Sequence, residues 1–343
     1  MSAPLLRVDQ VSCRFPVRRG VFGRVRGTIQ AVESVSFTLE RGETLGLVGE
    51  SGCGKSTLAR TLLGLERASG GRAVFEGQSL LDATGADLRR LRRRMQMVFQ
   101  DPAASLNPRM TVETILTEGL AAHGLLGTRS RAETAAGLLD KVGLNHDALH
   151  RYPHEFSGGQ RQRINIARAI ALEPAVVICD EAVSALDVSV QAQVLNLLTD
   201  LKAQLGLSYI FISHDLAIVR HVAQRVAVMY LGRIVETGPV EAVIDDPRHP
   251  YTQALISAIP KVGQRGNRRI VLGGEVPSPL HPPAGCAFHP RCPFATDACR
   301  ATIPALEPCR DDPHPSRRVA CIRRDTLQAD GKATDDGVNP EWH

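Results

Sequence analysis

The amino-acid sequence predicts an α/β fold built on a largely parallel sheet. Three observations predict it. Short apolar strands alternate with helical segments over most of the chain, a glycine-rich loop stands between an apolar strand and a helix, and a second apolar strand ends in two adjacent carboxylates. Such alternation is typical of parallel strands whose sheet is covered by helices.

The individual elements follow from apolar runs and from the glycines and prolines that bound them. Pro174, for example, marks the end of one helix, because the residue before a proline disfavours helical backbone. In chain order, we expect β-rich runs between Leu5 and Leu47 that end in a strand at Thr44–Val48, a helix at 56–65, a strand at 95–99, helical material over 112–142, a helix at 159–172, a strand at 175–179, a helix at 190–205, and strands at 208–212, 226–230 and 234–236.

The composition is that of a globular protein. The 343 residues are 43% hydrophobic and 22% charged, which argues against disorder, and a net charge of +5 is mild. At 4%, aromatic residues are few for a protein that binds single-stranded nucleic acid by base stacking. The arginine run 89–94 is predicted to form a solvated helix face. We therefore expect no nucleic-acid partner.

The sequence contains no export signal and no uncharged apolar stretch of about eighteen residues. We expect a cytosolic or peripheral protein, whose eight cysteines are thiols rather than disulfides. After Gly238 the character of the chain changes, as prolines, histidines and cysteines become frequent. We predict three parts: residues 1–240, with a helical subdomain at about 101–172; residues 241–323; and a polar tail, 324–343, expected to be disordered.

The glycine-rich loop has the pattern G-x-x-x-x-G-K-S, follows an apolar strand and opens a helix, which is the context that a phosphate-binding loop requires. Its glycines let backbone N–H groups point at a phosphate, Lys55 neutralises phosphate oxygens, and the Ser56 hydroxyl is a ligand for Mg²⁺. The residues predicted to bind the nucleotide here are Gly49, Glu50, Ser51, Gly52, Cys53, Gly54, Lys55, Ser56 and Thr57.

The second apolar strand ends at Asp180 and Glu181. The topology of a parallel sheet puts such a strand end beside the phosphate loop. Asp180 suits Mg²⁺, either as a direct ligand or through a water bound to the metal, while Glu181, one residue further out, suits the polarisation of a water for attack on the γ-phosphate. Without the upstream loop, an acidic pair of this kind would more often be a solvated turn.

The string FSGGQRQR at 156–163 resembles the signature of the ABC ATPase family. Read alone, Ser157-Gly-Gly would be only a helix N-cap after a turn. The resemblance implies a P-loop NTPase cassette of the RecA-like type, with an inserted helical subdomain, an antiparallel β subdomain and a small cysteine-rich C-terminal extension. It further implies that Ser157, Gly158, Gly159 and Gln160 hold the γ-phosphate of an ATP bound to a second cassette.

Four further positions match the same family. The resemblance implies that Gln100 senses the γ-phosphate and Mg²⁺, that Asp187 belongs to the D-loop, that His214 is the switch histidine of catalysis, and that Phe15 stacks on adenine. ATP and Mg²⁺ are the implied cofactors.

Three strings narrow the resemblance: QDPAASLNPR at 100–109, HPYTQAL at 249–255 and GCAFHPRCP at 285–293. They resemble the second-type ATPase subunits of bacterial oligopeptide and dipeptide importers. This implies a second ATPase subunit, two transmembrane permeases, an extracytoplasmic solute-binding protein, and a peripheral location on the cytoplasmic face of the inner membrane. Nickel or another small solute as cargo, and a non-transport ABC ATPase, stay open as alternatives.

Other ATPase classes fit less well. A DNA-repair ABC ATPase needs a long coiled coil within the cassette, and a translation-type factor carries two cassettes in one chain. A small-molecule kinase would leave the signature string without a purpose.

Five cysteines fall in a proline-rich segment with little apolar sequence. Such a segment cannot build a large core and needs cross-linking, for which a bound metal is suited. The spacing C-x5-C-x6-C lacks the C-x-x-C of structural zinc and departs from common ferredoxin spacings, so the residues predict a metal without choosing between iron and zinc. The importer resemblance favours a 4Fe-4S cluster on Cys286, Cys292, Cys299 and Cys321, with zinc or free thiols as alternatives. Cys309 is expected to be a spare thiol.

Overall fold

A computed structural model describes residues 3–19, 24–259, 270, 272–310 and 312–327. The chain forms two compact units. The first unit comprises residues 1–5, 39–44 and 82–212, and the second comprises 6–38, 45–81 and 213–343.

The first unit is built on parallel strands. Strand β7 (Val176–Asp180) pairs with β6 (Met95–Val98) on one side and with β8 (Ser208–Ser213) on the other. Every residue of β7 and β8 is buried, which explains why the interior of both strands is almost entirely apolar, because a strand covered on both faces has no polar side. The end of β7 carries the acidic pair of the predicted site.

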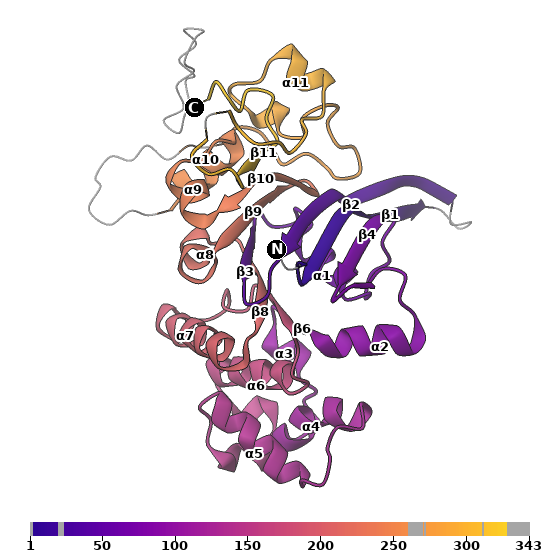
Figure 1. The fold of residues 1–343 in the computed structure, drawn as a ribbon, viewed down its shortest axis with the longest axis vertical. Helices are drawn as coiled ribbons and strands as arrows, with labels where there is room; N and C mark the ends of the chain where they lie inside the picture. The colour runs from indigo at the N-terminus through magenta and orange to yellow at the C-terminus, as the bar shows by residue number, and fades with distance from the viewer. Residues whose placement is uncertain (1–2, 20–23, 260–269, 271, 311, 328–343) are drawn as a thin grey trace. The chain divides into compact units, whose positions relative to one another are not determined.

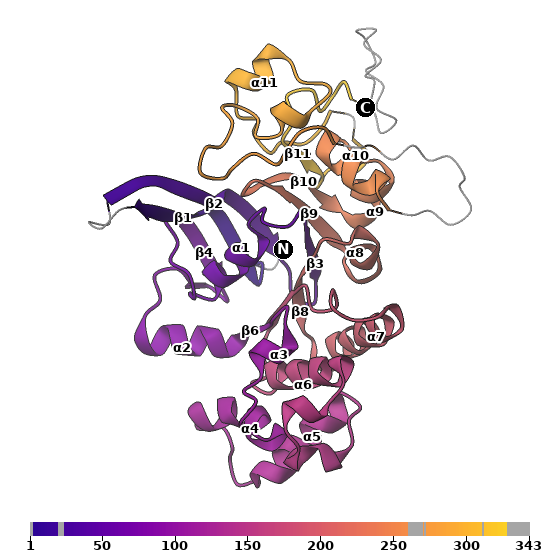
Figure 2. The ribbon, with the colours of Figure 1, turned by 180° about the vertical axis from the view of Figure 1, so that it is seen from behind.

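Helices make up the rest of the first unit, and α4, α5 and α6 gather in one group in Figure 2. Gly124 has a φ of 67° beyond the end of α4, and Ser130 and Glu133 form a capping box at the start of α5, so the predicted helical stretch 112–142 is divided in two. The helices are α2 (Gly85–Arg94), α3 (Pro102–Ser105), α4 (Val112–Ala122), α5 (Arg131–Lys141), η1 (His146–His150), η2 (Pro153–Glu155), α6 (Gly158–Ile170) and α7 (Val188–Leu205).

The second unit contains an antiparallel sheet in the order β2-β1-β4-β5, of which β2, β1 and β4 are labelled as neighbouring ribbons in Figure 1. Its strands are β1 (Leu6–Arg19), β2 (Arg24–Leu39), β4 (Gly70–Phe75) and β5 (Gln78–Ser79). At 14 and 16 residues, β1 and β2 are longer than the short runs expected from sequence. This sheet is the antiparallel β subdomain that the resemblance implied.

The phosphate loop also lies in the second unit. It follows β3 (Thr44–Val48), which pairs in parallel with β9 (Arg225–Tyr230), and β9 continues antiparallel to β10 (Arg233–Pro239). The helices of this unit are α1 (Lys55–Leu62), α8 (Leu216–Val222), α9 (Val240–Asp245), α10 (Pro250–Ser257), the 3-10 helix η3 (His289–Arg291) and α11 (Asp297–Ala301).

The C-terminal extension is joined to β10 through backbone pairing. Strand β11 (Arg318–Val319) pairs antiparallel with β10, and the completely buried guanidinium of Arg317 binds Asp246 and Asp312. Residues on both sides of position 240 therefore share one sheet. The boundary between a domain 1–240 and a region 241–323 stays a prediction.

Of the predicted tail, residues 328–343 lie outside the described part of the chain, whereas the first residues of the tail are folded. Arg324 binds Glu307, and Leu327 is buried. Across the described residues, no helix combines the length and apolar character needed to cross a membrane.

Candidate nucleotide-binding site

The phosphate loop joins β3 to α1 with a backbone that only glycine accommodates at Gly54. This residue has a φ of 107°, and a Cβ there would lie 2.1 Å from the carbonyl oxygen of Ala31. Gly49 is equally confined, since its Cβ would meet the carbonyl oxygen of Met229 at 2.1 Å. The first and last glycines of the motif are thus required by close backbone packing in the second unit.

The loop ends at a helix terminus suited to an anion. Among the described residues, no side chain caps α1 and no acidic residue lies in its first turn. The unbonded N–H groups and the helix dipole therefore favour a negatively charged ligand at this terminus. Lys55 is 4% exposed, and its Nζ donates to the carbonyl oxygens of Gly49 at 2.8 Å and Glu50 at 3.0 Å. The cation is therefore held directly over the loop. Of the remaining loop residues, Ser51 and Gly52 are exposed, Cys53 is buried, and Ser56 and Thr57 are half-buried.

The acidic pair stands at the end of β7 in the first unit, and its two members differ in exposure. Asp180 is 3% exposed, whereas Glu181 is half-buried. Glu181 has a φ of 46°, a left-handed conformation that costs energy in a residue with a Cβ and that concentrates at functional sites.

Three contacts hold Glu181 in that conformation. Its N–H donates to the Ile212 carbonyl at 3.0 Å, and its own carbonyl accepts from the Ser184 N–H at 3.1 Å and hydroxyl at 3.0 Å. Its carboxylate accepts from the Gln100 amide nitrogen at 3.1 Å. The structure thus brings together two residues predicted separately and adds Ser184 as a support for the Glu181 backbone.

The signature residues begin α6. The hydroxyl of Ser157 accepts from the N–H of Gln160 at 3.3 Å, and the Gln160 side chain accepts from the N–H of Ser157 at 3.1 Å, forming a capping box. Ser157, Gly158 and Gln160 are exposed. A Cβ on Gly159 would lie 2.5 Å from Val190 of α7, so helix packing explains that glycine. Asp187 caps α7 by accepting from the N–H of Val190 at 2.9 Å.

The last two predicted residues lie in the second unit. His214 is exposed immediately after β8, and Phe15 is half-buried in β1. Their roles toward the γ-phosphate and adenine stay predictions.

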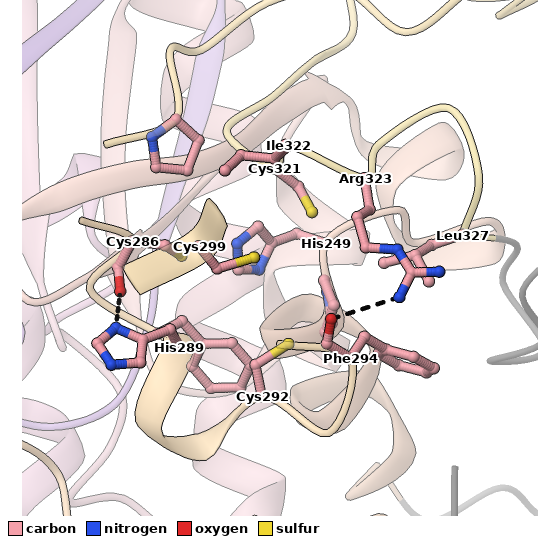
Figure 3. A pocket seen from close by; sticks show the side chains of 13 residues that line it. His249, Cys286, His289, Cys292, Phe294, Cys299, Cys321, Ile322, Arg323 and Leu327 are labelled. Carbon is pink, nitrogen blue, oxygen red and sulfur yellow. Dashed lines mark hydrogen bonds between the residues drawn. The ribbon is translucent and has the colours of Figure 1, made fainter. Parts of the chain in front are cut away.

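Four of the five C-terminal cysteines line a single pocket. They are Cys286, Cys292, Cys299 and Cys321, and Figure 3 shows the sulfurs of Cys292, Cys299 and Cys321 facing the same space. The walls are largely apolar and include Phe288 and Phe294. Cys309 is not among the residues that line this pocket, and its expected role as a spare thiol stays a prediction.

Burial, together with the nearby cysteines, raises the pKa of the thiols of Cys292 and Cys321 to about 12. In the described part of the chain, no three or more His, Cys, Asp or Glu side chains are grouped so that they could hold a metal ion. The metal site expected from the cysteine spacing therefore stays a prediction.

These features define a P-loop nucleotide-binding protein: an apolar strand, a glycine loop closed by Lys55, and a helix whose N-terminus has no side-chain cap. Residues 32–184 match the family described as ABC transporter, and residues 235–299 match the oligopeptide/dipeptide transporter C-terminal region.

Relatives extend this match over the chain. The oligopeptide transport ATP-binding protein AppF of Bacillus subtilis is 50% identical, over 92% of this chain and 96% of that protein. The dipeptide transport ATP-binding protein DppF of Escherichia coli is 51% identical, over 90% of this chain and 92% of that protein. A dimeric ATP-binding cassette, MJ0796, solved in a post-hydrolysis state with ADP and Pi, has a TM-score of 0.61 and 25% identity, covering 68% of this chain and 98% of that one. This chain belongs to the ABC transporter family, as an ATPase of its ATP-binding subunit type.

Proposed function

We propose that this ATPase energises a bacterial importer of dipeptides or oligopeptides. The observation that carries the proposal is the presence, in one chain, of an intact set of hydrolytic motifs and of a C-terminal region matching that of oligopeptide and dipeptide transporters. The names of the relatives at about half identity support the same cargo class. An importer for nickel or another small solute is the second candidate.

Each side chain has a defined task in the proposed hydrolysis. Lys55 and the loop N–H groups bind the phosphates, while Ser56, Asp180 and Gln100 serve the Mg²⁺. Glu181 accepts a proton from the water whose oxygen attacks the γ-phosphorus, and the bond to the β–γ bridging oxygen breaks, so that ADP leaves.

The remaining residues contact the nucleotide at its ends. His214 binds the γ-phosphate and Phe15 stacks on adenine. In support of the catalytic assignment, Gln100 and Glu181 are already hydrogen-bonded, and the Glu181 backbone is held by Ile212 and Ser184.

The proposed assembly is a pair of cassettes beneath two permeases, at the cytoplasmic face of the inner membrane. Ser157, Gly158, Gly159 and Gln160 act on the ATP of the second ATPase subunit, and the exposure of three of these four residues leaves them accessible to it. An extracytoplasmic solute-binding protein delivers the cargo.

We further propose that the pocket of four cysteines holds a 4Fe-4S cluster with a structural role. The support is the donor set, because four thiols share one pocket. The backbone N–H groups of Phe288, Phe294 and Arg323 donate to the sulfurs of Cys286, Cys292 and Cys321, respectively, and oppose the rise in thiol pKa that burial causes. Hydrogen bonds to sulfur are a common way in which proteins tune such clusters. Zinc is the alternative metal.

Metal analysis tests the cluster. Protein purified without oxygen should contain about four irons per chain and absorb near ~400 nm, as thiolate-ligated clusters do. Cys292→Ser should lose iron and Cys309→Ser should keep it. Folded wild-type protein with neither iron nor zinc would reject a metal in the pocket.

Substrate-stimulated hydrolysis tests the cargo. The complete transporter in nanodiscs should hydrolyse ATP faster when its solute-binding protein is loaded with di- or oligopeptides than when it is empty. Stimulation by nickel and not by any peptide would support the second candidate instead.

A further inference from the structure

The C-terminal extension reaches the phosphate loop through one ion pair within the second unit. Arg291 Nη1 lies 2.9 Å from Glu50 Oε2, and Nη2 lies 3.2 Å from Oε1, which is the geometry of a forked, two-bond pair. The arginine side chain is 7% exposed and that of Glu50 is 28% exposed. Solvent therefore screens this pair less than it screens an ordinary surface pair.

A second contact from the same part of the chain fixes the backbone of Glu50. The N–H of Glu50 donates to the hydroxyl of Tyr251 at 2.8 Å, and its carbonyl accepts from Lys55 at 3.0 Å. Glu50 is thus held by two residues that lie far along the chain from it: Tyr251, 201 positions later, and Arg291, 241 positions later.

These two groups are themselves held by an aromatic cluster. The ring of Tyr251 lies 4.7 Å from that of Tyr230 and 5.5 Å from that of Phe288. The guanidinium of Arg291 lies 5.9 Å from the Tyr230 ring and donates to its hydroxyl at 3.5 Å. Because Tyr251 and Phe288 are almost completely buried, the cluster has little freedom to shift.

The position of Arg291 in the chain links the loop to the cysteine pocket. It ends η3, where its N–H donates to the carbonyl of Phe288 at 3.0 Å, and the next residue is Cys292. Phe288 and Cys292 both line the pocket. Arg291 is thus joined by one hydrogen bond and one peptide bond to two residues that line the pocket.

We propose that Arg291 is a positioning residue of the phosphate loop, through which the cysteine-bearing extension sets the affinity for ATP. The ion pair preorganises the loop, so that nucleotide binding does not have to order it. The proposal rests on nucleotide binding by the phosphate loop, and it holds whether or not the pocket contains a metal.

A double-mutant cycle on the full-length chain tests the proposal. The affinity for a fluorescent ATP analogue is measured for wild type, Arg291→Gln, Glu50→Gln and the double variant. Each single change should weaken binding about tenfold, and the double variant should be no weaker than either single variant, because both remove the same interaction. Arg291→Lys, which keeps the charge and loses the fork, should fall between wild type and Arg291→Gln.

Arg300→Gln is the matched control, since Arg300 belongs to the same extension and its contact with Asp297 is solvent-exposed. It should bind like wild type. In the assembled transporter, Arg291→Gln should raise KM for ATP about tenfold and change kcat by less than about twofold, a split that general loss of structure would not produce.

Wild-type affinity in Arg291→Gln, or single effects that multiply in the double variant, would overturn the proposal. If Arg291→Gln does not fold, Glu50→Gln still tests it from the loop side, where unchanged affinity would also overturn it. A wild-type chain that binds no ATP would contradict the proposed function instead.

Discussion

Glu181 is the residue on which hydrolysis depends in this account. Its left-handed backbone is held by Ile212 and Ser184, and its carboxylate by Gln100, so the side chain is positioned before substrate arrives. A carboxylate fixed in this way loses little entropy when it orients a water for attack.

Glu181→Gln should leave ATP affinity within a few-fold of wild type and lower turnover by a factor on the order of a hundred or more, because the amide keeps the shape but cannot accept the proton. Steady-state ATPase measurements on the assembled transporter check this. Glu173→Gln is the control, since Glu173 is an exposed glutamate in the same unit with a φ of 51°. Wild-type turnover in Glu181→Gln would refute the assignment of the base.

At the residue scale, local patterns identified the loop, the acidic pair and the signature. The contact between Gln100 and Glu181 was not predictable, because it joins residues 81 positions apart. Arg291 was missed as a partner of Glu50 for the same reason, over 241 positions. No local periodicity encodes such pairs.

At the element scale, the first residues of α6 must both cap the helix and allow it to pack closely against α7. Ser157 and Gln160 cap the helix, while Gly159 lets α6 approach α7 at Val190. The sequence interpretation assigned Gly159 to phosphate binding alone, and the structure adds a packing reason that only the approach of the second helix reveals.

Gly159→Ala should therefore destabilise the first unit by about 1–3 kcal/mol, because the added methyl overlaps Val190. Adding Val190→Ala in the same chain should recover most of that loss. Gly158→Ala provides the comparison, since its Cβ would lie at an ordinary 3.7 Å from Leu186. Urea unfolding measures all three, and equal stability of the two alanine variants would contradict the packing argument.

The junction between β10 and α10 contains a buried acid. Glu236 is fully buried and accepts from the N–H groups of Arg248 at 3.0 Å and His249 at 2.9 Å. Burial raises the pKa of its carboxyl to about 7, although these hydrogen bonds oppose the shift. The folded state therefore binds this proton more tightly than the unfolded state does.

The stability contributed by that proton is fully present below about pH 4.5 and is lost as the pH rises through about 7, at no more than about 1.4 kcal/mol per pH unit. Glu236→Gln should remove this part of the slope of unfolding free energy against pH. Glu241→Gln, at an exposed position, should keep the wild-type slope. Identical slopes in wild type and Glu236→Gln would show that the carboxyl titrates normally.

Secondary structure was largely predictable at this scale. The strand at Thr44–Val48 has the expected bounds, and the strand at 95–99 ends one residue early. The pairing of β11 with β10 was not predictable, because a two-residue strand has no periodicity and its partner lies some eighty residues earlier.

At the scale of the whole molecule, the chain carries one phosphate loop and one signature. If the signature serves the nucleotide of a second cassette, the isolated subunit should be a poor ATPase. Mixing it with its partner ATPase and permeases should raise the rate per chain by about tenfold or more. Full activity in a preparation that light scattering shows to be strictly monomeric would contradict the shared-site mechanism.

The most direct test of the central claim is peptide uptake into liposomes that contain the complete transporter, with the solute-binding protein outside and ATP supplied to the ATPase side. With the wild-type chain we predict ATP-dependent accumulation of a labelled di- or oligopeptide, and with Glu181→Gln no uptake above that measured without ATP. Equal uptake with both chains, or uptake of nickel and of no peptide, would contradict the account.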